Sequence, residues 1–148
     1  MAFHFSLDAL LRMWRSREKF ERIRLETLAT KIQRLRNEIE AAEEASLQSR
    51  RNVANSLAEG ASGSQIQFAA LCVDGQRRFR ELMEKQIEQL TRQLEAQRKV
   101  LEHAHQQREI LDNLRSRQLD AYRLEETRKM QQEVDELFLS RRGFRTID

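Results

Sequence analysis

Histidine and cysteine are the side chains in this sequence best able to bind a metal ion or act as nucleophiles. His103 and His105 are two residues apart, so on a helix they would point about 200° from each other. They could not bind one metal ion together, and we interpret both as solvated. Cys72 is the only cysteine, and no histidine is placed to activate it. We interpret it as a small packed apolar residue, and no internal disulfide is possible.

The sequence also lacks the motifs that usually accompany catalysis. It has no glycine-rich phosphate loop, no GxSxG turn and no array of zinc ligands. A rod of two helices would offer no concave site that excludes water. We therefore expect a protein without enzymatic activity, cofactor, metal ion or small-molecule substrate.

Composition favours long helices. Of the 148 residues, 34% are charged and 39% hydrophobic, with no proline and only four glycines. An all-β fold would need many more turn residues, and a disordered chain would lack such regular apolar positions. The 27 basic and 24 acidic residues give a net charge of only +3, which indicates a surface of mixed sign. No apolar run is long enough for a membrane span and the N-terminus does not resemble a signal peptide, so we expect a cytoplasmic protein.

One interruption divides the chain into two helices. Residues 59–65 read EGASGSQ, the strongest helix-breaking segment present. Ser64 with Gln67 fits a capping box that would open the second helix, and Gly143 would end it. We predict an all-α fold in a single coiled-coil domain over 1–148: an antiparallel hairpin with a helix over about 5–58, a turn over 59–64, a longer C-terminal helix over about 65–140 and a tail over 141–148.

Both predicted helices carry an apolar seam with alternating steps of four and three, which is typical of a coiled coil. The first seam comprises Leu7, Leu11, Trp14, Glu18, Glu21, Leu25, Leu28, Ile32, Leu35, Ile39, Ala42, Ser46, Ser49 and Val53. The second comprises Met83, Ile87, Leu90, Leu94, Gln97, Leu101, Ala104, Arg108 and Leu111.

Folding the chain at the turn brings the two seams together. In an antiparallel hairpin centred near Gly63, paired residue numbers would sum to about 126. Gln97 then faces Leu28, and Glu18 faces Arg108. A charged pair inside an apolar seam fixes the register while adding little stability.

The two helices differ in length, roughly 80 Å and 110 Å at 1.5 Å per residue. Residues from about 120 to 140 would therefore project beyond the N-terminal end as a lone helix. Its apolar residues are too sparse to fold alone, and an isolated helix of this length is marginal in water. We infer that this segment contacts a partner. Phe79, and with it Met83, would stay partly exposed where Ser46 and Ser49 offer little apolar surface, as interaction sites often do.

Two other functions fit part of this pattern. Arginine supplies 22 of the 27 basic residues, and arginine suits phosphate contacts. Most of these arginines have acidic neighbours, however, so we favour a solvated helix surface over nucleic-acid binding. A structural scaffold, in which coiled coils join into a longer bundle, is the other alternative.

Two segments resemble the FliJ proteins of bacterial flagellar export. The opening FHFSLDALLRMWRSREKFE is similar to their N-terminus, with alternating Phe, then Leu-x-x-Leu-Leu and a run of Arg and Glu. Residues 111–142 resemble their C-terminal signature, which includes an Asp-Glu pair, here Asp135 and Glu136. The length and the glycine-containing central turn also fit, whereas residues 60–78 are the least similar.

The resemblance implies a non-enzymatic component of flagellar type III export at the cytoplasmic face of the inner membrane. FliJ proteins form an antiparallel coiled coil similar to the stalk of a rotary ATPase γ subunit. They sit in the pore of the hexameric export ATPase, promote its assembly, link it to the membrane export gate and handle export chaperones. The chain alone would be monomeric. The resemblance carries the ATPase contact to Arg12, Arg15, Arg128, Asp135 and Glu136, and the gate contact to Phe79, Met83 and Leu90.

Overall fold

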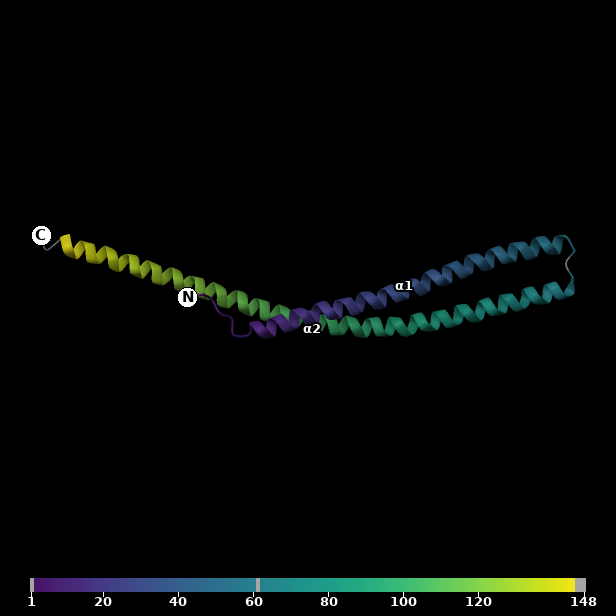
Figure 1. Cartoon of the computed structure of the whole chain (residues 1–148), viewed down its shortest axis with the longest axis horizontal. Coiled ribbons are helices and arrows are strands. Elements are labelled where there is room, and N and C mark those ends of the chain that lie inside the picture. The colour runs from purple at the N-terminus through teal and green to yellow at the C-terminus, as the bar shows by residue number, and fades with distance from the viewer. Residues whose placement is uncertain (1, 61, 146–148) are drawn as a thin grey trace. The chain divides into compact units, whose positions relative to one another are not determined.

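The chain folds into two long helices. The computed structural model describes residues 2–60 and 62–145, and within these it contains α1 (Asp8–Ala58, 51 residues), α2 (Gly63–Arg145, 83 residues) and no strand (Figure 1). The expected all-α helical hairpin is confirmed. Helix-favouring residues supply the backbone preference, and the apolar seams supply the packing that holds long helices together in water.

The turn between the helices is set by a glycine and a capping box. Gly60 has a φ of +95°, a conformation that glycine adopts without strain just beyond a helix end. At the start of α2, the side-chain oxygen of Gln65 accepts a hydrogen bond from the backbone N–H of Ser62 at 3.1 Å. The capping box therefore begins at Ser62 rather than at the predicted Ser64, and α2 starts two residues earlier than expected.

The N-terminal residues do not extend α1 to residue 5 as predicted. Phe5 is instead almost fully buried, in a cluster with Leu11 and Leu111. The Phe3 ring lies 5.6 Å from the Tyr122 ring, measured between centroids. A non-helical start lets both phenylalanines reach α2, so aromatic burial offsets the lost helical turn.

The C-terminal end of α2 also differs from the prediction. The helix passes through Gly143 and ends at Arg145, so no tail begins at 141 within the part described. Glycine in a helix costs only about 1 kcal/mol relative to alanine. Arg142 and Arg145 in the last turn complement the negative end of the helix dipole.

The helices pair in two units. The first joins α1 up to Glu18 with α2 from His103, and the second comprises Lys19–Glu102. In each unit the predicted seam is the least exposed row of each helix; of its members, only Leu7 and Ser49 are exposed. Leu11 is fully buried in the first unit, and Ile32 is 5% exposed in the second. The sequence pattern is therefore the actual packing surface.

The first unit ends in a helical segment that is exposed along its whole described length. Every residue from 127 to 145 is exposed, and we call this segment the overhang. The overhang begins a few residues later than predicted, because Phe3, which precedes α1, contacts Tyr122 of α2. Its apolar side chains are at least 60% exposed: Met130, Val134, Leu137, Phe138, Leu139 and Phe144.

Candidate functional site

A layer of charged side chains interrupts the apolar seam of the first unit. Glu18 is 6% exposed; its Oε2 accepts a hydrogen bond from Nε of Arg108, and its Oε1 lies 3.0 Å from Nδ1 of His105. Arg108 also binds Asp112, which accepts a 2.7 Å hydrogen bond from Arg15. The predicted Glu18–Arg108 pair is confirmed, and the structure extends it to a network that links both helices.

The network lowers the pKa of two carboxyl groups. Burial raises the pKa of Glu18, but hydrogen bonds and the positive charge from His105 and Arg108 outweigh it and hold the pKa below its usual value. The same balance, with Arg15 and Arg108 as donors, lowers the pKa of Asp112. Both groups are therefore held as carboxylates, and their role is to fix the pairing of α1 with α2.

A second polar layer lies in the second unit. Glu21 is 3% exposed, and the side-chain amide of Gln97 donates to both its carboxylate and its backbone carbonyl. Gln97 was expected to face Leu28, so its partner lies two helical turns away along α1. A buried carboxylate needs a hydrogen-bond donor, and Leu28 needs none. This requirement explains the choice of partner.

The residues assigned to the ATPase contact all belong to the first unit. Arg12 pairs with Asp8 at 3.2 Å and is exposed, and Arg15 pairs with Asp112 in the charged network. Arg128, Asp135 and Glu136 lie on the exposed overhang. The structure does not bring these five side chains together in one cluster. Arg12 and Arg15 lie on α1, where Arg15 pairs with Asp112, and the other three lie along the overhang.

The residues assigned to the gate contact lie on α2 in the second unit. Phe79 is 38% exposed, whereas Met83 and Leu90 are half-buried in the seam. Phe79 is therefore the most accessible of the three. Leu82, which neighbours Met83, is 60% exposed and was not among the candidates, because it falls outside the seam that drew attention to this region.

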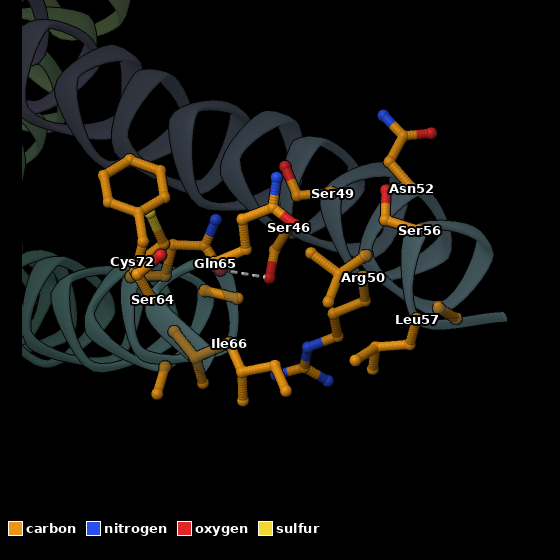
Figure 2. Close-up of a pocket in the computed structure, with 17 residues that line it drawn as sticks. Ser46, Ser49, Arg50, Asn52, Ser56, Leu57, Ser64, Gln65, Ile66 and Cys72 are labelled. Carbon is orange, nitrogen blue, oxygen red and sulfur yellow. Dashed lines mark hydrogen bonds between the residues drawn. The ribbon is translucent and has the colours of Figure 1, made fainter. Parts of the chain in front are cut away.

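A groove between the helices adjoins the turn. It has a volume of about 750 Å³ and is lined by residues of α1 from Ser46 to Leu57 and of α2 from Ser64 to Gln76. Figure 2 shows the side chain of Arg50 extending between the helices toward Leu57 and Ile66. Small serines on α1 leave this space unfilled. A partial signal for the groove was present in the sequence, since Ser46 and Ser49 occupy seam positions that normally hold larger apolar residues.

Ser46 ties the two helices together at one end of this groove, which we call the turn groove. Its hydroxyl donates a hydrogen bond to the side-chain oxygen of Gln76 (Figure 2). Leu57 and Ile66, near the other end, are each 47% exposed. The turn groove therefore combines accessible apolar side chains with one cationic side chain, and no carboxylate lines it.

The comparisons with known proteins decide the family. A family model described as "Flagellar FliJ protein" matches residues 3–146. The chain belongs to the FliJ family. Comparisons with curated proteins and with solved structures found no match. The match spans both helices and the turn, so it includes the N-terminal and C-terminal segments that resemble FliJ in sequence.

As a FliJ protein, the chain is related to flagellar export, in which FliJ proteins are non-catalytic components. Within the described residues, no group of three or more His, Cys, Asp or Glu side chains could hold a metal ion. Neither described helix is long and apolar enough to cross a membrane. Within the described chain, apolar side chains are exposed on the overhang, at Phe79 and Leu82, and at the turn groove.

Proposed function

We propose that this FliJ protein acts as a stalk for the flagellar export ATPase. In this role the overhang enters the central opening of the hexameric ring, promotes ring assembly and raises ATP turnover. The part of α2 that includes Phe79, Met83 and Leu90 contacts the membrane export gate. Export chaperones bind the same protein. The protein works at the cytoplasmic face of the inner membrane and does not itself catalyse a reaction.

The observation that carries this proposal is the overhang. It exposes six large apolar side chains on a segment whose described residues are all exposed, and a helix of this composition gains stability by burying that surface. A ring pore is a site where one helix can be covered on several sides. Charges on the overhang, including Arg128 and Asp135, would then contact polar groups of the pore.

Ring assembly provides the test. Adding the chain to the purified ATPase is expected to increase both the fraction of hexamer and the rate of ATP hydrolysis. Leu137→Asp places a charge on the overhang and is expected to abolish both effects. Ile110→Asp changes a residue of similar exposure, 60% against 64%, outside the overhang and is expected to have no effect. An unchanged ATPase with the wild-type chain would count against the proposal.

The gate contact needs a separate experiment. Phe79→Ala removes the most exposed of the three assigned side chains and is expected to weaken binding to the cytoplasmic domain of the gate protein by about tenfold or more. Phe20→Ala is a matched control, because Phe20 is 55% exposed on α1 and outside the assigned surface. Equal binding by both variants would show that the gate uses a different surface.

The scaffold alternative predicts a different outcome. A scaffold would form a stable tetramer that buries the overhang and would not stimulate the ATPase. Sedimentation of the purified chain, together with the ATPase assay, separates the two functions.

A further inference from the structure

The turn groove has the chemistry of a docking site for an acidic amphipathic helix. Its lining combines apolar side chains, including Val53, Ile66 and Val73, with the guanidinium of Arg50. Arg50 also lines an adjoining hollow that includes Arg77. Within the described chain neither arginine forms an ion pair, whereas nearby Arg80 pairs with Glu43 at 2.7 Å. The groove therefore offers apolar surface bordered by positive charge without a carboxylate partner.

The overhang carries the complementary pattern. Residues 130–140 read MQQEVDELFLS, with three acidic residues and no basic one. Met130, Val134 and Leu137 follow steps of four and three, so they form one apolar stripe along the helix. Glu133 and Asp135 lie on opposite sides of that stripe, because each residue turns the helix by about 100°. Every one of these residues is exposed.

The two surfaces also match in length. Residues 130–140 span roughly 16 Å of helix, and the α1 wall of the groove, from Ser46 to Leu57, spans about the same length. Both surfaces include residues of the single continuous helix α2 (Gly63–Arg145), and a continuous helix cannot fold back to lie against itself. An overhang that fills the groove must therefore come from a second copy of the chain.

We propose that copies of this chain associate head to tail, with residues 130–140 of one copy lying in the turn groove of the next. Charge favours the head-to-tail arrangement over the two symmetric arrangements, overhang against overhang and groove against groove. Two overhangs brought together would oppose acidic segments, and two grooves would oppose arginines. A head-to-tail contact does not close on itself, so association continues to longer species as concentration rises. This proposal replaces the expectation that the chain alone is monomeric, and it is independent of the proposed export role.

Sedimentation of the purified full-length chain, with no other protein present, tests the proposal. A single short helix forms a small interface, so we expect micromolar affinity and measure between about 1 and 300 μM. The average mass is expected to rise with concentration at low salt. Because the contact pairs acidic with basic groups, binding is expected to weaken by about tenfold in 0.5 M salt. A monomer throughout this range would overturn the proposal.

Two complementary variants distinguish this contact from any other. Val134→Asp blocks the overhang, and Ile66→Asp blocks the groove; both residues are exposed, so neither change disturbs the packed seam. Each variant alone is expected to stay monomeric. Their mixture is expected to form a one-to-one dimer and nothing larger, since only one intact overhang and one intact groove remain. Failure of the mixture to associate would overturn the proposal.

Control variants test whether an introduced charge prevents association at any exposed position and whether association uses another surface. Ile23→Asp alters a 53%-exposed residue of α1 outside both surfaces and is expected to associate like the wild type. Arg50→Glu is expected to abolish association, and Glu133→Arg in the partner copy is expected to restore part of it. Association that persists in Val134→Asp would show a contact elsewhere and would also contradict the proposal. None of these outcomes depends on whether the chain binds an export ATPase.

Discussion

Glu18 shows how one buried charge can specify how two helices pair. An apolar seam of leucines tolerates a shift by one heptad, because each layer resembles the next. Glu18 does not tolerate it, since its carboxylate would then lose Arg108 and His105 while remaining buried. The cost of an unpaired buried carboxylate is what discriminates between registers. In the second unit, the buried carboxylate of Glu21 and the side chain of Gln97 specify the helix pairing in the same way.

Loss of the Glu18 carboxylate is expected to destabilise the first unit. Glu18→Ala leaves Arg108 without one of its two carboxylate partners and opens a small cavity, at a cost of about 1–3 kcal/mol. Glu88→Gln breaks an exposed pair with Arg92 and is expected to cost no more than about 0.5 kcal/mol. Thermal melts followed by circular dichroism compare the two, and equal losses would show that burial of Glu18 contributes nothing.

The lowered pKa values predict acid sensitivity. Glu18 and Asp112 each have a lower pKa in the folded chain than in the unfolded one, so folding favours their ionised forms. This contribution is complete above the pKa values of the unfolded chain and is lost as the pH falls through the lower pKa values of the folded chain. The melting temperature is expected to fall over that range. In Glu18→Gln with Asp112→Asn the fall is expected to be smaller, and an identical pH profile would contradict the assignment.

At the scale of an element, the glycines of this chain have opposite roles. Gly75 lies inside α2 with a negative φ, and a Cβ added there would meet no atom within 4 Å. Gly60 has a φ of +95° in the turn, where a side chain is strained. The same substitution should therefore have opposite effects at the two positions.

Gly75→Ala is expected to stabilise the chain by about 0.5–1 kcal/mol, because alanine loses less backbone entropy in a helix. Gly60→Ala is expected to destabilise it by about 1 kcal/mol, because alanine must adopt a left-handed conformation. Urea unfolding measures both changes on the same scale. Stabilisation by both variants would mean that the turn does not require its glycine.

Helix identity and packing surface could be predicted from this sequence because both follow from local and periodic rules. Alternating steps of four and three identified the buried row of each helix, including its polar members Glu18 and Arg108. Helix ends were less predictable, because tertiary contacts decide them. Phe5 leaves the helix to enter a cluster with Leu11 and Leu111, and no local rule shows that this burial outweighs a helical turn.

Of the two candidate surfaces, one could be predicted from the sequence and the other depends on tertiary structure. The overhang followed from comparing two helix lengths, so it could be predicted before its exposure was known. The turn groove could not, since it depends on how far the helices separate near the turn. The small side chain of Ser46 indicated that the seam is underfilled at this position. The depth of the groove also depends on the hydrogen bond between Ser46 and Gln76.

At the scale of the whole molecule, stability and function should separate along α2. Residues 127–145 are all exposed, so a chain that ends at Glu126 keeps every packed residue of both seams. Its melting temperature is expected to stay within about 3 °C of the wild type. The fraction of the helical signal lost should match the deleted length.

The same truncation is expected to abolish both stimulation of the export ATPase and head-to-tail association, because each requires the apolar stripe around Val134. The two activities would compete in the full chain, since one overhang cannot occupy a ring and a groove at once. Adding the truncated chain to wild type supplies free grooves without free overhangs, and is expected to reduce stimulation of the ATPase as its concentration rises. Undiminished stimulation at saturating truncated chain would show that the groove does not cover the surface that the ATPase uses.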